Sequence, residues 1–341
     1  MERDRGAEMT APTGGPEWPA VVRTEDARFE DLPGFPFAPH YHVVENPHGD
    51  EGLRMHYIDE GPPDAPVVLM VHGEPTWSYL YRKLVPVFAA AGLRAVAVDQ
   101  VGFGRSDKPT RSSHYSFENH VEWLRQFVVG TDLREITLVC QDWGGPISLG
   151  VLAQETERFA RVVAGNTMLH TGEPELADRL AWSAHGSGDA DSTVSLALLD
   201  WMHYSHRAVD FTAAPSVRGA TALGLSDVEA AAYDAPFPSE WHKAGMRQFP
   251  VLIPVTRTDP GAAINRATWE ALARFDRPFL TLFGDSDPGT GGWDRIFQER
   301  VPGAKGQPHD TLSETGHFWQ EDRGEEVAQR IVEWIASPGA A

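Results

Sequence analysis

The chain has 341 residues, which exceeds the usual size of one hydrophobic core but fits one large α/β domain that carries an insertion. Apolar residues make up 41% and charged residues 23% of it, as is typical of a soluble globular protein. The chain has 49 acidic and 29 basic residues and a net charge of −20. It should therefore repel phosphate backbones, so we do not expect nucleic acid as a partner.

Cysteine content and the N-terminal segment bear on where the protein works. Cys140 is the only cysteine, which excludes an internal disulfide and favours a reducing cytoplasm. Residues 1–28 carry charges and prolines without the apolar stretch of a secretory signal, so we expect a flexible tail. No part of the chain approaches the roughly 18 consecutive apolar residues that span a bilayer. We therefore expect a cytoplasmic protein that does not enter a membrane.

In chain order, short apolar runs alternate with segments of helical pattern. The first two runs, residues 40–47 and 53–61, predict a pair of antiparallel strands. The next runs are continuously apolar, which predicts strands buried on both faces, at 66–73, 93–99, 135–140 and 159–167. Helices are predicted between them at 79–92, with Gly92 as its end, and at 116–130 and 145–157.

The alternation breaks between residues 168 and 266, where Ala, Trp and Pro are frequent and no strand is evident. Within this region Ser226 is a predicted N-cap, and Glu229 completes a capping box. The pattern then resumes, with segments at 269–275, 278–284, 292–303, 308–317 and 324–335. Repeated strand–helix units predict a mostly parallel sheet with helices on both faces. We expect a core domain of residues 29–167 and 267–341, and a helical cap of residues 168–266.

The segment Gln141-Asp142-Trp143-Gly144-Gly145 follows the strand at 135–140 and begins the next helix. A strand, a sharp turn with small residues and a helix are typical of the nucleophile elbow of α/β-hydrolases, whose sheet usually has eight strands. Asp142 occupies the position of the nucleophile, and no Gly-x-Ser-x-Gly sequence offers a serine instead. Asp142 could also serve only as an N-cap of the helix, but its place in the strand order favours the nucleophile.

A carboxylate nucleophile restricts the chemistry. Attack on an acyl carbon would give an unproductive anhydride, whereas attack on a saturated carbon gives an ester that water can cleave. The leaving group should therefore depart from sp³ carbon. Halide and epoxide oxygen are the two obvious choices.

The ester requires a base, and the base requires an acid that orients it. His317 follows the last strand and precedes the final helix, which is the position of the hydrolase histidine. The strand that ends in "LFGDSDP" offers Asp285 and Asp287, of which we favour Asp287 as the acid. Asn166 lies where some related hydrolases carry the acid that orients the histidine. Because an amide cannot serve as that acid, this position does not compete with Asp287.

Negative charge develops on the ester carbonyl oxygen during hydrolysis. Backbone N–H groups stabilise such charge well, because they are already fixed in place. We expect the N–H groups of Trp143, which follows the nucleophile, and of Glu74, in the loop "VHGEPTW", to form this oxyanion hole.

Together, the segments "VHGEPTWSYLYRKL", "DQVGFGRSDKP", "QDWGGPISLG", "AGMRQFP" and "ETGHF" resemble the haloalkane dehalogenases, from about His40 to the last helix. The resemblance is strongest to the subfamily with Glu in the His-Gly-Glu-Pro loop and its catalytic acid after the penultimate core strand. It implies that Trp143 donates its indole N–H to the halide. A second indole from the cap should donate from the other side, with Trp201 the first choice among Trp182, Trp201 and Trp241, and Trp182 the second. Phe249 and Pro250 match family residues that line the halide pocket.

The resulting hypothesis is a hydrolase that needs no cofactor or metal and acts on a small haloalkane and water, releasing an alcohol and a halide ion. We expect it to be a monomer or a weak dimer. The main alternative is an epoxide hydrolase with the same Asp–His–Asp triad, for which Tyr204 and Tyr233 could serve as acids. Gln141, where epoxide hydrolases usually have His, and Glu74 argue against it.

Two further alternatives fit the sequence less well. A fluoroacetate dehalogenase would carry arginine after the nucleophile, and Trp143 cannot replace that arginine. A binding protein without catalysis often loses part of the triad, whereas here the nucleophile, the acid and the base are all present in the expected order.

Overall fold

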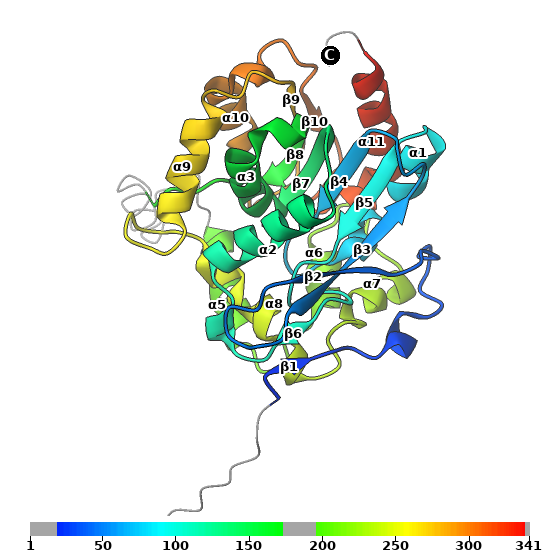
Figure 1. The fold of residues 1–341 in the computed structure, drawn as a ribbon, viewed down its shortest axis with the longest axis vertical. Coiled ribbons are helices and arrows are strands. Elements are labelled where there is room, and N and C mark those ends of the chain that lie inside the picture. The colour runs from blue at the N-terminus through cyan, green and yellow to red at the C-terminus, as the bar shows by residue number, and fades with distance from the viewer. Residues whose placement is uncertain (1–18, 173–195, 338–341) are drawn as a thin grey trace, which may run out of the picture.

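At the centre of the molecule lies an eight-stranded sheet in the order β10-β9-β8-β7-β4-β5-β3-β2 (Figure 1). This computed structural model describes residues 19–172 and 196–337. The strands are β2 (His40–Val44), β3 (Leu53–Glu60), β4 (Val67–Val71), β5 (Arg94–Val98), β7 (Ile136–Asp142), β8 (Phe159–Thr167), β9 (Phe279–Gly284) and β10 (Asp310–Leu312). Pairing is antiparallel between β2 and β3 and between β3 and β5, and parallel elsewhere. The predicted mostly parallel sheet with an antiparallel start is confirmed.

The central strands are mostly apolar and buried. Every residue of β4 is buried, and β7 is buried up to its last residue, Asp142. Helices on both faces of the sheet remove each strand from water, which is why these strands lack the alternation of a half-exposed strand. A separate two-stranded sheet pairs β1 (Val21–Val22) with β6 (Lys108–Pro109).

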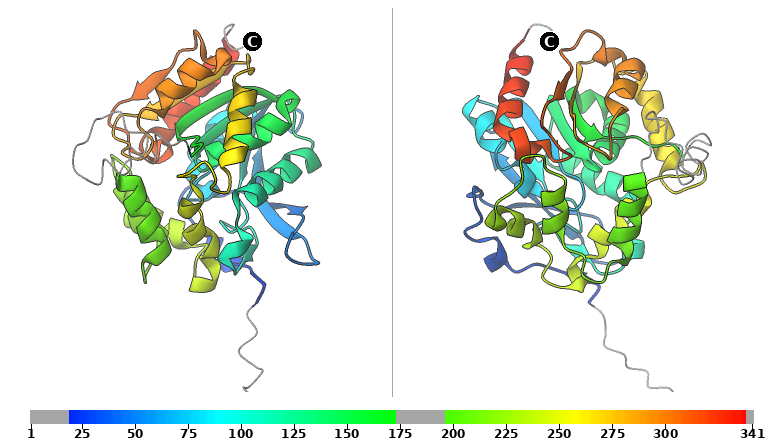
Figure 2. Two further views of the ribbon diagram at one scale, coloured as in Figure 1. Left: turned by 90° about the vertical axis from the view of Figure 1, so that its left-hand side faces the viewer. Right: turned by 180° about the vertical axis from the view of Figure 1, so that it is seen from behind.

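Helices pack against both faces of the sheet (Figures 1 and 2). One face carries α2 (Phe117–Gly130), α3 (Gly144–Gln154) and α9 (Ala262–Leu272). Gly150 of α3 lies between Val121 of α2 and Ile264 of α9. α10 (Trp293–Arg300) adjoins α9, and α1 (Val85–Ala90) and α11 (Trp319–Ala336) cover the other face.

The helix predicted for residues 79–92 is wrong in its extent. The structure has a 3-10 turn at η2 (Ser78–Tyr81) and only a short α1 after it. Pro86 lies in the first turn of α1, where its missing N–H costs no hydrogen bond, whereas inside one long helix it would remove one. Gly92 follows the end of α1 with φ of 78°, as expected for a glycine stop.

The described part of the cap region is helical, with α5 (Leu196–Arg207), α6 (Ala213–Gly219), α7 (Asp227–Asp234) and α8 (Ala244–Gln248) gathered at one end of the molecule (Figures 1 and 2). The capping box of Ser226 and Glu229 at the start of α7 is confirmed. The expected boundary between residues 266 and 267 lies inside α9, which packs on α3 of the core. The division into tail, core and cap stays a prediction.

A buried ionic cluster joins α7 of the cap to the core. Arg82, after η2, pairs with Glu321 of α11 and donates to Glu229 of α7 at 3.0 Å. Tyr233 of α7 donates its hydroxyl hydrogen to the same Glu321 carboxylate. Because Arg82 and Glu321 are both shielded from water, removing one would leave the other with only a more exposed partner, Glu229 for Arg82 and Lys83 for Glu321, at a cost of up to about 3–5 kcal/mol.

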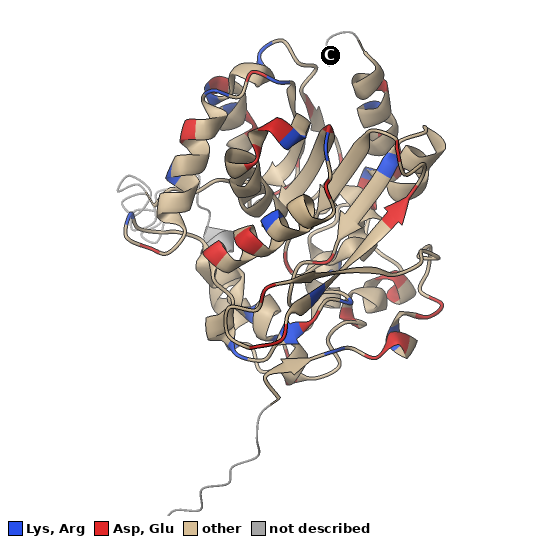
Figure 3. Cartoon of the chain, in the orientation of Figure 1, with Lys and Arg blue, Asp and Glu red and all other residues tan. Residues whose placement is uncertain are grey.

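Charged residues of both signs are distributed over the outer helices and loops (Figure 3). Within residues 19–172 and 196–337, no helix is long and apolar enough to cross a bilayer.

Candidate active site

β7 ends in a strained turn. Asp142 has φ of 50°, a left-handed conformation that non-glycine residues rarely adopt. A Cβ on Gly144 would lie 1.9 Å from the carbonyl oxygen of Val71, and one on Gly145 would lie 1.8 Å from Thr167 Oγ1. Only glycine fits at these two positions, so the predicted elbow and its need for small residues are both present.

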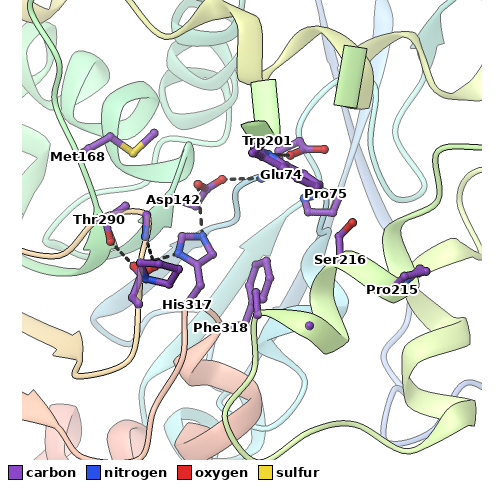
Figure 4. A pocket seen from close by; sticks show the side chains of 15 residues that line it. Glu74, Pro75, Asp142, Met168, Trp201, Pro215, Ser216, Thr290, His317 and Phe318 are labelled. Carbon is purple, nitrogen blue, oxygen red and sulfur yellow. Dashed lines mark hydrogen bonds and ion pairs between the residues drawn. The ribbon is translucent and has the colours of Figure 1, made fainter. Parts of the chain in front are cut away.

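The Asp142 side chain points away from α3. Its Oδ1 accepts a hydrogen bond from the backbone N–H of Glu74 at 2.7 Å, and its Oδ2 lies 3.4 Å from His317 Nε2 (Figure 4). The N-cap of α3 is Trp143, which makes no side-chain cap. The alternative of Asp142 as a simple helix cap therefore has no support in its contacts.

The loops after β9 and β10 bring the other two triad candidates together. His317 Nδ1 lies 3.0 Å from Asp287 Oδ2. Asp285 is turned to the loop instead, where it accepts hydrogen bonds from Ser286 and from the backbone N–H groups of residues 314 and 315. Of the two aspartates offered by the sequence, Asp287 is the one against the imidazole.

Charges within the site shift two pKa values. Burial alone would lower the pKa of His317, but the carboxylates of Asp287 and Asp142 outweigh it and raise the pKa to about 10. Burial would raise the pKa of Asp287, yet the charge of His317 and the donors Thr290 and Gly289 hold it below its usual range. The two neighbouring carboxylates therefore favour the protonated form of the imidazole.

This ion pair should stabilise the fold in a defined pH window. Since the pKa of His317 rises from 6.5 to about 10 on folding, its contribution is complete below about pH 6.5 and is lost as the pH approaches about 10. The free energy of unfolding of the wild type, minus that of His317→Gln, should accordingly shrink over this interval. Urea titrations of both proteins at several pH values measure it, and a difference independent of pH would contradict the assignment.

Two amides to which the sequence analysis gave no contact with His317 hold it in place. The side-chain nitrogen of Gln141 lies 2.9 Å from His317 Nε2 and 3.2 Å from the His317 carbonyl oxygen. Asn166 donates to the carbonyl oxygens of Gly316 and His317 and accepts from the N–H of Gly284. Asn166 therefore ties the histidine loop to β9, a role that its place at the end of β8 could have indicated.

The two expected halide donors differ in their contacts. Trp143 is buried, stacks on Phe249 with ring centroids 5.3 Å apart, and makes no indole hydrogen bond to any described residue. Trp201, on α5, donates its indole N–H to Glu74 Oε2 at 3.0 Å. Trp182 lies outside the described residues.

A cavity of about 330 Å³ opens in front of Asp142. Its lining includes the triad candidates, Glu74 and Trp201, with apolar side chains such as those of Met168 and Phe318 (Figure 4). Trp143, Phe249 and Pro250 are not among its lining residues, and their expected places at the halide site stay predictions. Phe249 lies behind the Trp143 ring, stacked between Trp143 and His120.

The two cap tyrosines are poorly placed for epoxide opening. Tyr233 is fully buried and bound to Glu321. Tyr204 is 45% exposed and packs beside Trp201 and Phe211. Neither lines the cavity around Asp142, so neither is placed to protonate an alkoxide there.

Comparison with known proteins agrees with this geometry. The sequence model of the α/β hydrolase fold matches residues 66–203. Two haloalkane dehalogenases are similar over nearly their whole length: one from Psychrobacter cryohalolentis is 46% identical over 92% of this chain and 98% of that protein, and one from Mycobacterium marinum is 44% identical over 92% and 99%. A solved tetrameric haloalkane dehalogenase from Paraglaciecola agarilytica superposes with a TM-score of 0.78 at 36% identity, covering 91% of this chain and 97% of that one. With this similarity over almost its full length, the chain belongs to the haloalkane dehalogenases.

Proposed function

We propose that this chain hydrolyses haloalkanes to an alcohol, a halide ion and a proton through an alkyl ester on Asp142. The observation that carries the proposal is a carboxylate on the elbow, 3.4 Å from an imidazole that is itself paired with Asp287 at 3.0 Å. The relatives from Psychrobacter and Mycobacterium, both haloalkane dehalogenases, support the substrate class.

In the first step, an Asp142 carboxylate oxygen attacks the carbon that bears the halogen. A C–O bond forms as the carbon–halogen bond breaks, and the halide leaves with the electron pair. A halide is a weak base that needs hydrogen-bond donors in a dry pocket and no proton. An indole N–H only donates, so Trp143 and Trp201 suit this role.

Ester formation changes the charge next to His317. Alkylated Asp142 is neutral, so one of the two carboxylates that raise the pKa of His317 is lost, and this pKa falls. His317 Nε2 then releases its proton while Nδ1 keeps the proton held by Asp287. The base becomes active only once there is an ester to hydrolyse, and the Gln141 amide, 2.9 Å from Nε2, stabilises the neutral ring by donating to it.

In the second step, His317 Nε2 takes a proton from water, and the hydroxide adds to the ester carbonyl carbon of Asp142. The negative charge on the carbonyl oxygen is stabilised by the N–H of Glu74, which already donates to Asp142 Oδ1 at 2.7 Å, and by the N–H of Trp143. Collapse expels the alkoxide, which takes the proton from His317 and leaves as the alcohol. The proton of the added hydroxyl then passes from the Asp142 carboxyl group to His317, which restores the carboxylate and the protonated imidazole. The reaction balances as haloalkane plus water, without a cofactor or metal.

A side-by-side assay separates this proposal from epoxide hydrolysis. We expect bromide release from 1-bromobutane and 1,2-dibromoethane, and no diol from styrene oxide, because an opening epoxide needs an acid that the cavity lining lacks. Ion chromatography and gas chromatography measure the two products from one enzyme preparation. Diol formation at a rate equal to or above halide release would reject the proposal.

The proposal extends to the protein's surroundings. Cys140 is a free, buried thiol, which supports function in the reducing cytoplasm without disulfides. The expected monomer or weak dimer stays a prediction, and the similar Paraglaciecola enzyme is a tetramer.

A further inference from the structure

The side chain of Glu74 has contacts that its backbone role does not need. It is 3% exposed and lines the same cavity as Asp142. Its Oε2 accepts the Trp201 indole N–H at 3.0 Å, while its Oε1 is buried without a hydrogen-bond partner among the described residues. Figure 4 shows Glu74 and Trp201 side by side next to Asp142. A buried carboxyl group with only one of its two oxygens hydrogen-bonded requires an explanation, above all in a catalytic cavity.

The charges around Glu74 oppose its ionisation. Burial and the nearby carboxylate of Asp142 raise the pKa of Glu74 well above its ordinary value, against the opposing effects of the Trp201 N–H and the charge of His317. Asp287 lines the same cavity but is paired with His317.

Several other titratable groups lie on elements packed against Glu74. His72, which precedes the loop, has a pKa lowered by burial, which favours its neutral form. On α5, the helix of Trp201, the titratable side chains are exposed to solvent: Asp200, His203, Tyr204, His206 and Arg207. Glu74 is thus the buried carboxyl group of the cavity whose ionisation its surroundings oppose.

Glu74 and a halide ion need the same donor. An indole has one N–H, so Trp201 cannot fully serve a carboxylate and a halide at once. Two negative charges sharing one donor in a buried site would repel each other strongly. A halide can therefore take over the Trp201 N–H at low cost only when Glu74 is neutral.

We propose that Glu74 is a positioning residue that holds the Trp201 indole in the empty enzyme, and that a halide ion displaces it from this N–H while Glu74 takes up one proton. The proton comes from solvent, forms an O–H bond on the carboxyl group and is lost again when the halide leaves. Halide release should then be favoured at higher pH. The inference rests on the proposed role of Trp143 and Trp201 as halide donors.

Bromide affinity as a function of pH tests the proposal. Between about pH 5.5 and about pH 9, the dissociation constant for bromide should rise about tenfold per pH unit above the midpoint of Glu74, as expected for one linked proton. His317, with a pKa of about 10, stays protonated over this range and adds no slope. Quenching of tryptophan fluorescence measures the affinity, and calorimetry in two buffers of different ionisation enthalpy should count about one proton taken up.

Variants separate charge from position. Glu74→Gln keeps an oxygen that accepts from Trp201 but cannot ionise, so its bromide affinity should be independent of pH and its proton uptake zero. Asp200→Asn is the matched control, because it removes an exposed carboxylate from α5 and should retain the wild-type slope. In Trp201→Phe, ionised Glu74 loses its N–H donor, and the midpoint of the slope should move to higher pH.

The outcomes are distinct. The inference is overturned if the bromide dissociation constant of the wild type does not change with pH, or if Glu74→Gln keeps the wild-type pH dependence. If Glu74→Gln does not fold, an unchanged midpoint of this pH dependence in Trp201→Phe overturns it instead. Trp143→Phe tests the underlying halide site at low pH. If this variant binds bromide as tightly as the wild type, the proposed halide site is wrong. If it binds bromide more weakly but the bromide affinity of the wild type does not depend on pH, only the role of Glu74 is rejected.

Discussion

Bromide release from 1-bromobutane is expected to fall by at least about 10⁴-fold in Asp142→Ala, because no other group in the cavity can form the ester. Asp287 is bound to His317 at 3.0 Å, and Glu74 is held by Trp201 at 3.0 Å. Neither carboxylate is free to take over the attack. Ion chromatography of released bromide under saturating substrate measures the loss.

Asp142→Asn is the companion variant for this experiment. Asparagine tolerates the left-handed φ of 50° better than alanine and preserves the shape of the turn, so the elbow should be kept without its nucleophile. Both variants should melt within a few degrees of the wild type. Wild-type rates in either one would remove Asp142 from the mechanism.

His317→Phe is expected to separate the two halves of the reaction. Alkylation needs only the Asp142 carboxylate and the halide donors, whereas hydrolysis needs the base, so its rate should drop by about 10⁴-fold or more. The variant should release about one bromide per active site in a burst and then stop. Its Asp142 peptide should gain the mass of the alkyl group.

Intact-protein and peptide mass spectrometry give the readout for this trap. Double substitution His317→Phe with Asp142→Asn is the matched control, which should show neither burst nor added mass. Continued turnover at the wild-type rate in His317→Phe, or the added mass on another residue, would contradict the assignment of the base.

The sheet was predictable because its strands are buried on both faces. β4 is a continuous apolar run, β7 is apolar from Leu138 to Cys140, and glycines follow both strands within two residues. The order of Asp142, Asp287 and His317 along the chain followed from the order of the strands that carry them. The capping box at Ser226 was predictable for a similar reason, since it depends only on residues three apart.

What the sequence did not reveal depends on long-range packing. The choice between Asp285 and Asp287 depends on which side of one loop faces His317, and spacing does not determine that. The positions of Phe249 and Gln141 depend on neighbours contributed by other elements, such as the Trp143 ring and the histidine loop. The pairing of Glu74 with Trp201 joins residues 127 positions apart, one from the core and one from the cap.

The ionic cluster between Arg82, Glu321, Glu229 and Tyr233 has a consequence for protein engineering. A chimera that receives the cap of another dehalogenase would inherit this enzyme's Arg82 and Glu321 without the tyrosine that accompanies them, unless the donor has an equivalent of α7. Such chimeras should be destabilised at this contact between α7 and the core, so their substrate preferences could not be compared. The cluster favours designs that transplant the residues on both sides of the contact as one unit, or that limit the exchange to α5 and its surroundings.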